Sequence, residues 1–147
     1  MSTVLSVIIP AHNAARWIAA AIDSVRTQAL PTVPDIIVVT DRCSDQTANI
    51  ALATGARIID SPTAGPSAAR NAGVAASHSR YIAFLDADDL WPPDSCAARL
   101  ALLDATPDAA MVFGDCRQFD DRDGNPHFHA HTLFVKGGRD VAFFGDA

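Results

Sequence analysis

Short, almost entirely apolar segments alternate with amphipathic ones along most of this chain. The apolar segments are strand-like and span residues 5–9, 35–40, 56–60, 81–85 and 111–114. Strands with so few polar residues are typical of a parallel sheet whose two faces are both covered by helices. The sequence therefore predicts an α/β fold with a mostly parallel, Rossmann-like sheet and helices on both faces.

The amphipathic segments between the strands are the predicted helices. They span residues 14–28, 45–54, 67–76 and about 94–105. Asp45 or Ser44 is expected to cap the second helix, and Gly55 to end it. Ligands of such sheets bind beyond the carboxyl ends of the strands, so the polar residues that follow each strand form the candidate site.

Three aspartates, Asp86, Asp88 and Asp89, directly follow the strand at residues 81–85. If the chain stays extended, Asp86 and Asp88 point to the same side and can share one ion. Carboxylate oxygens are hard ligands that suit Mg²⁺ or Mn²⁺. The alternative is a solvated turn in which Asp89 caps a following helix.

Polar residues also follow the other strands, at 10–13, 41–45 and 65–71. Asp41 could accept a hydrogen bond from a base or ribose, or it could only form a turn with Ser44. Residues 65–67 offer a helix amino terminus that favours an anion, or an ordinary cap. Arg70 suits a diphosphate or a carboxylate, and an ion pair with one of the aspartates is the alternative.

Composition limits the class of protein. A chain of 147 residues with 49% hydrophobic residues is expected to form one globular domain. The net charge of −6, without a run of Lys or Arg, argues against nucleic-acid binding.

The apolar stretch Val4–Ile9 is too short for a signal peptide or a transmembrane segment, so a cytoplasmic location is predicted. Cys43, Cys96 and Cys116 lack metal-ligand spacing and are expected to be free thiols.

Four segments carry a resemblance to a known family. They are residues 5–13, 37–41, 65–73 and 81–91. In order and spacing they resemble the signatures of family 2 glycosyltransferases with the GT-A fold, over about the first 95 residues. The resemblance implies a single domain over residues 1–147, in which residues 1–95 are the donor-binding core and residues 96–147 an incomplete acceptor-side part.

The resemblance also implies a function. A family member of this kind transfers a sugar from a nucleotide-diphosphate sugar, here a UDP- or GDP-sugar, with inversion and with Mn²⁺ or Mg²⁺ as cofactor. Asp41 would contact the base, and Asp86 the ribose. The implied nucleotide-binding residues are Pro10, Asn13, Asp41, Arg70 and Asp86, and the implied metal ligands are Asp88 and Asp86.

The chain departs from the family pattern in two places. Thr40-Asp41 stands where two aspartates are usual, and Arg42-Cys43 replaces the common Gly-Ser, so base recognition is expected to differ. Ala14-Ala15 follows Asn13, where an acidic residue is frequent.

The catalytic base is not identified. In the family it is a carboxylate on a later segment, commonly Glu-Asp. Residues 137–147 resemble that passage, but Asp146 and Ala147 stand at the two acidic positions, so the base is absent if the alignment is taken literally. A chain that lacks the acceptor-side sheet and helices is expected. The acceptor, a glycan, a lipid or a polysaccharide precursor, is unknown, and peripheral membrane association and a homodimer paired through an exposed sheet edge stay open.

Two other functions stay open. A haloacid dehalogenase-type phosphatase would use Asp86 as nucleophile beside Mg²⁺, and a non-catalytic module would only hold the nucleotide sugar. The alternating His127, His129 and His131 could form a second metal site, but no fourth ligand is suitably spaced, so a polar strand face is expected. Trp17 and Trp91 are interpreted as core or rim packing.

Overall fold

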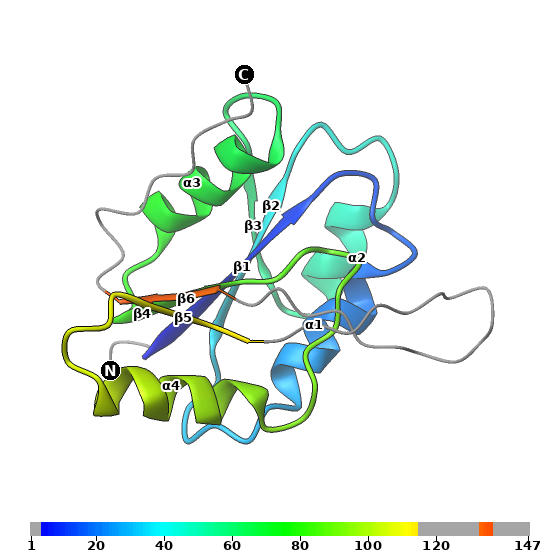
Figure 1. Cartoon of the computed structure of the whole chain (residues 1–147). Helices are drawn as coiled ribbons and strands as arrows, with labels where there is room; N and C mark the ends of the chain where they lie inside the picture. Colours follow the sequence, from blue (N-terminus) through cyan, green and yellow to red (C-terminus); the bar gives the residue numbers. More distant parts are fainter. Residues whose placement is uncertain (1–3, 115–132, 137–147) are drawn as a thin grey trace.

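The computed structural model describes residues 4–114 and 133–136, and strands and helices alternate along it (Figure 1). The elements are β1 (Leu5–Ala11), α1 (Ile18–Arg26), β2 (Asp35–Thr40), α2 (Thr47–Ala53), β3 (Arg57–Asp60), α3 (Pro66–Ala76), β4 (Tyr81–Phe84), α4 (Ser95–Ala105), β5 (Met111–Phe113) and β6 (Leu133–Lys136). The predicted order of the first nine elements is confirmed.

The strands form a six-stranded sheet with the order β3-β2-β1-β4-β6-β5. The first four strands in this order are parallel to one another, and β6 pairs antiparallel with both β4 and β5. From β1 the chain runs outward to β2 and β3 and then returns to the other side of β1 as β4. The strand order therefore reverses at β1, which is where α/β sheets bind ligands.

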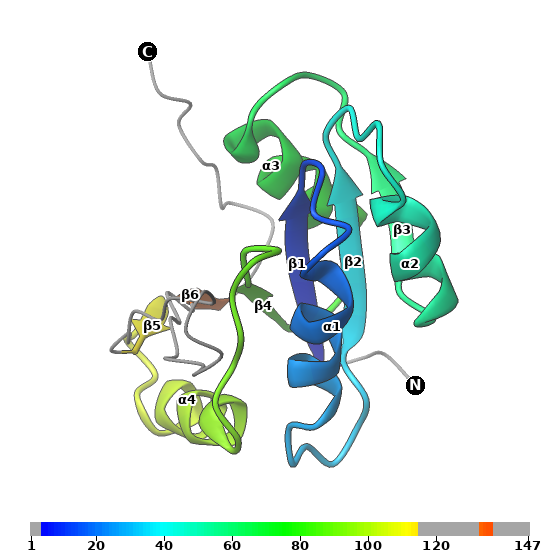
Figure 2. The same ribbon diagram turned by 90° about the vertical axis from the view of Figure 1, so that its right-hand side faces the viewer.

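Helices cover both faces of the sheet (Figure 2). Val7 and Ile9 of β1 pack with α1, α2 and α4 on one face, while Ile8 packs with α3 on the other. Successive residues of a strand point to opposite faces, so a strand buried on both sides needs an unbroken apolar run. Residues 7–9 of β1, 36–39 of β2 and 81–84 of β4 meet this requirement, and the polar Ser6 of β1 is buried as well.

Two helices begin later than predicted. Helix α1 begins at Ile18 instead of residue 14, because the backbone N–H groups of Ala14 and Ala15 donate to the side chains of Thr47 and Asp45. Helix α2 begins at Thr47 instead of residue 45, and Gln46 occupies the N-cap position. Asp45 lies outside this helix and accepts the N–H of Thr47 at 3.0 Å. Long-range contacts between the two loops thus override the local helix signals.

Strand β6 was not predicted, although it lies in the sheet between β4 and β5. Within the described residues, the structure contains no helix that is long and apolar enough to span a bilayer.

Candidate functional site

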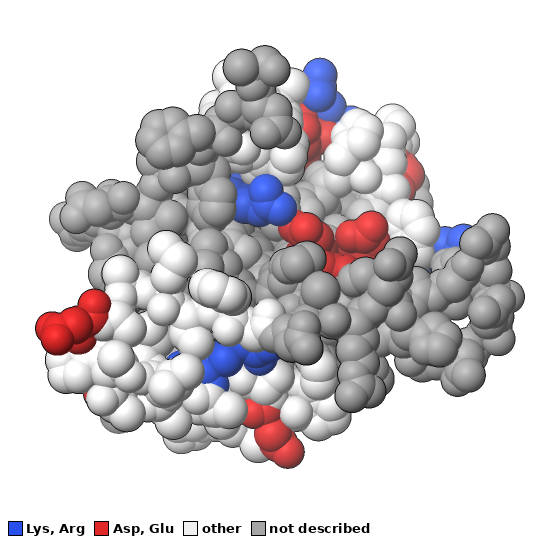
Figure 3. Space-filling view, in the orientation of Figure 1, with Lys and Arg blue, Asp and Glu red and all other residues white. Residues whose placement is uncertain are grey.

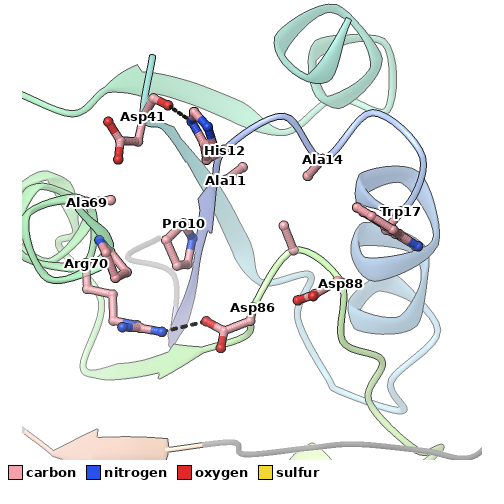
Figure 4. Close-up of a pocket in the computed structure, with 12 residues that line it drawn as sticks. Pro10, Ala11, His12, Ala14, Trp17, Asp41, Ala69, Arg70, Asp86 and Asp88 are labelled. Atoms are coloured by element: carbon pink, nitrogen blue, oxygen red, sulfur yellow. Dashed lines mark hydrogen bonds and ion pairs between the residues drawn. The ribbon is translucent and has the colours of Figure 1, made fainter. Parts of the chain in front are cut away.

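A pocket of about 350 Å³ lies beyond the carboxyl ends of β1, β2 and β4 (Figure 4). Its lining comes from four segments that are distant in sequence: the end of β1 with the following loop, the end of β2, the start of α3, and the turn after β4. The lining residues are Pro10, Ala11, His12, Ala14, Trp17, Asp41, Pro66, Ala69, Arg70, Asp86, Ala87 and Asp88. Figure 3 shows acidic and basic side chains close together in the middle of this face.

Asp41 supplies a buried carboxylate to the pocket wall. Its Oδ2 accepts the backbone N–H of Gly65 at 2.8 Å, and its Oδ1 accepts Nε of Arg42 at 2.9 Å. The Gly65 N–H, followed by the Arg42 guanidinium, holds the pKa of Asp41 below its usual value. Asp41 is therefore an ionised group that can only accept hydrogen bonds, and its remaining lone pairs are available to a ligand donor.

His12 and Asn13 join the loop after β1 to the loop after β2. Nδ1 of His12 lies 2.6 Å from the carbonyl oxygen of Asp41, and because a carbonyl only accepts, this nitrogen carries the proton. Oδ1 of Asn13 accepts the backbone N–H of Ser44 at 2.8 Å. Asn13 is not a lining residue of the pocket, so its expected contact with a nucleotide stays a prediction, and its observed contact joins the two loops.

Arg70 and Asp86 form an ion pair inside the pocket, drawn as a dashed line in Figure 4. Nη2 of Arg70 lies 2.6 Å from Oδ1 of Asp86. The ion pair with an aspartate, which the sequence left open as an alternative for Arg70, is therefore observed. The side chain of Arg70 is largely covered, and both residues line the pocket.

The aspartates after β4 lie in a turn and are not extended. The N–H of Asp89 donates to the carbonyl oxygen of Asp86 at 3.0 Å. Asp86 and Asp88 nevertheless both line the pocket, and Asp88 is exposed. The expectation that Asp89 could cap the next helix is wrong, because α4 begins at Ser95 with Asp94 at its N-cap.

The acidic residues fit a divalent cation that is only partly held by protein. Over residues 4–114 and 133–136 no cluster of three or more His, Cys, Asp or Glu side chains could enclose a metal ion. Asp88 offers an exposed carboxylate, while Asp86 already has Arg70 as partner. Mg²⁺ and similar ions commonly bind one or two carboxylates and complete their shell with water and substrate phosphates. This site matches that pattern.

His12 and Trp17 are among the pocket residues that were not predicted as site residues. His12 directly follows β1, and this position at the end of a strand is the sequence feature that could have identified it as a site residue. Trp17 is 38% exposed and lines the pocket, whereas Trp91 is 2% exposed and lies in the core. Of the two tryptophans interpreted as core or rim packing, Trp17 therefore lies at the rim and Trp91 in the core. His127, His129 and His131, Cys116 and residues 137–147 lie outside the described residues.

Comparisons with known proteins identify the family. Residues 6–143 match the sequence model described as Glycosyl transferase family 2. An uncharacterized glycosyltransferase of Rickettsia felis is 35% identical over 105 residues, which cover 69% of this chain and 17% of that protein. The putative glycosyltransferase EpsH of Bacillus subtilis is 30% identical over 101 residues, which cover 65% of this chain and 29% of that protein. This chain therefore spans less than a third of the length of these two relatives.

Solved structures share the fold. A mannosyltransferase from Pyrobaculum calidifontis in complex with GDP-Man and Mn²⁺ matches with a TM-score of 0.75 and 21% identity, over 92% of this chain and 45% of that chain. A Mycobacterium tuberculosis glucosyl-3-phosphoglycerate synthase in complex with Mn²⁺, UDP-Glc and phosphoglyceric acid matches with a TM-score of 0.64 and 25% identity, over 76% of this chain and 43% of that chain. These matches confirm the predicted GT-A type of α/β fold, and together with the family match they show that the chain belongs to glycosyl transferase family 2.

Proposed function

We propose that this chain is the donor-binding part of an inverting, metal-dependent glycosyltransferase that takes a sugar from a UDP- or GDP-sugar. The acceptor and the catalytic base are not assigned. The pocket carries the proposal, because it places an ionised acceptor, an arginine and an exposed carboxylate along one cavity, as a nucleoside diphosphate with its cation requires.

Asp41 is the proposed contact of the base. Bases present N–H donors, and an ionised carboxylate whose orientation is fixed by Gly65 and Arg42 is a matched acceptor. In Figure 4, Asp41 lies on one side of the pocket, and Asp86 and Asp88 lie farther along it. Pro10 and Ala69 supply apolar surface between these polar groups.

Arg70, Asp86 and Asp88 are proposed to hold the rest of the nucleotide. The planar guanidinium of Arg70 lines the pocket and suits a phosphate. Oδ2 of Asp86 can accept from a ribose hydroxyl, and Asp88 would be a metal ligand, with Asp86 beside it. When bound, Mn²⁺ or Mg²⁺ would neutralise charge that develops on the leaving diphosphate.

The M. tuberculosis synthase supports this assignment, since it is 25% identical and its structure contains Mn²⁺ and UDP-Glc. The family match leaves the phosphatase alternative without support.

Calorimetric titration of UDP and of GDP, with and without Mn²⁺, tests the proposal. We expect Mn²⁺-dependent binding of one of them to the wild type and at least about tenfold weaker binding to Asp88→Asn. Asp108→Asn is the matched control, because Asp108 is an exposed carboxylate on the loop after α4 and does not line the pocket.

The absence of nucleotide binding to the wild type, or equal metal-dependent binding to Asp88→Asn, would contradict the assignment. Release of UDP or GDP from the nucleotide sugar when candidate acceptors are added then separates transfer from binding alone.

A further inference from the structure

Arg42 has a backbone conformation that is unfavourable for its side chain. Its φ is 48°, in the left-handed region that residues other than Gly, Asn and Asp rarely adopt. It directly follows Asp41 in the pocket wall, and its side chain is 70% exposed. A loop selected for its backbone alone would place glycine here, so the arginine calls for an explanation in terms of its guanidinium.

The guanidinium acts on the carboxylate of Asp41. Nε of Arg42 donates to Oδ1 at 2.9 Å, while the N–H of Gly65 donates to Oδ2 at 2.8 Å. Gly65 also has a positive φ, of 106°. Two donors, one from the next residue and one from the loop before α3, thus hold both oxygens of the carboxylate.

The rest of the guanidinium remains available. Among residues 4–114 no side chain pairs with the Nη groups of Arg42, and its bond to Asp41 uses Nε. The Nη groups belong to the same planar guanidinium as Nε, so they lie near the carboxylate that Nε holds. An acceptor that lines the pocket, Asp41, and an exposed donor on the next residue, Arg42, therefore stand side by side.

We propose that Arg42 is a positioning residue for base recognition, which orients the Asp41 carboxylate and offers an Nη group to a base carbonyl. The ligand class is a base whose ring N–H lies beside a carbonyl, as in uracil and guanine. The N–H donates to Asp41, and the neighbouring carbonyl accepts from Arg42. This inference rests on the proposed function, in which the pocket binds a nucleoside diphosphate.

The test uses Arg42→Gly and Arg42→Asn, both of which suit a left-handed backbone. We expect the Kd for the preferred nucleotide, UDP or GDP, to rise about tenfold with Mn²⁺ present, the loss of one charge-assisted hydrogen bond. The melting temperature of Arg42→Gly should be equal to or above that of the wild type, because backbone strain is relieved. A purely structural arginine would lose stability and affinity together.

Arg80→Asn is the matched control. Arg80 also pairs with an aspartate, Asp104, at 3.1 Å, and its side chain is 64% exposed. However, Arg80 directly precedes β4, so it lies at the end of this strand that is farther from the pocket. Its substitution should leave the Kd unchanged. In an Asp41→Asn background, Arg42→Asn should add less than about twofold, because the positioned group is gone.

The outcomes separate the inference from the proposed function. If the wild type binds neither UDP nor GDP, both fail. If it binds one of them and both Arg42 variants keep the wild-type Kd, the inference alone is overturned. CDP, whose base lacks the ring N–H, should bind at least about tenfold more weakly than the preferred nucleotide, and equal binding of CDP would overturn the base assignment.

Discussion

At the scale of single residues, the loop after β2 is organised by two carboxylates that accept hydrogen bonds. Asp41 accepts from Gly65 and Arg42, and Asp45 accepts from Thr47 and Ala15. The Thr47 hydroxyl is the main cause that lowers the pKa of Asp45, as the Gly65 N–H is for Asp41. The hydrogen bonds that shape this loop therefore favour the ionised form of both carboxylates.

Asp41→Asn should change the acid sensitivity of the protein. The folded-state pKa of Asp41 is below its usual value of 3.8, so the ionised form stabilises the fold above that value. This contribution is lost as the pH falls through the lowered pKa. Thermal unfolding from about pH 6 to about pH 3 should show a shallower acid limb for the variant. Identical limbs for wild type and variant would contradict the assignment.

Most of the site residues that the sequence selected do line one pocket. Pro10, Asp41, Arg70, Asp86 and Asp88 converge there because each lies at or just after the carboxyl end of a parallel strand, or in the first turns of the helix before one. Residue spacing along the chain does not define the distances between segments. Those distances decide that Arg70 pairs with Asp86, and they decide where the side chain of Asn13 lies.

At the scale of elements, α3 approaches β1 unusually closely. A Cβ atom on Gly73 would lie 2.4 Å from Cγ2 of Ile8, which is shorter than any real contact of that kind. Gly73 is buried in the middle of α3, and Ile8 is fully buried on β1. The glycine therefore sets the helix-to-sheet distance, and α3 in turn carries Arg70 into the pocket.

Gly73→Ala should destabilise the protein by about 1–3 kcal/mol, because the added methyl group overpacks this contact. Ala75→Gly, at an exposed position of the same helix, measures the opposite change in helix propensity and should destabilise by about 1 kcal/mol. Chemical denaturation of both variants is the measurement. If propensity decided the outcome, Gly73→Ala would instead be more stable than the wild type.

At the scale of the whole molecule, two apolar cores hold the sheet between its helices. The larger core joins α1, α2 and α4 to one face, and the smaller joins α3 to the other. Cys96 of α4 is fully buried in the larger core, where burial raises the pKa of its thiol to about 12. Cys43 is only half-buried, and its thiol lies 3.3 Å from the carbonyl oxygen of Ala11.

Thiol labelling should therefore distinguish the two cysteines. In a Cys116→Ser background, we expect Cys43 to react with iodoacetamide in the folded protein, and Cys96 to react only through global unfolding. Mass spectrometry of labelled peptides, with increasing urea below the unfolding transition, measures this. Rapid labelling of Cys96 without urea would mean that α4 opens independently of the sheet.

The sequence by itself determined the element types and the edge of the sheet where the polar residues gather, because hydrophobic periodicity and turn residues are local properties of a chain. Only the tertiary structure decided the later starts of α1 and α2 and the position of β6 between β4 and β5. It also decided that Arg42 and Gly65 both donate hydrogen bonds to the carboxylate of Asp41. With the exception of the Arg42 bond, these features join segments far apart along the chain, and their energies exist only once the sheet has brought those segments together.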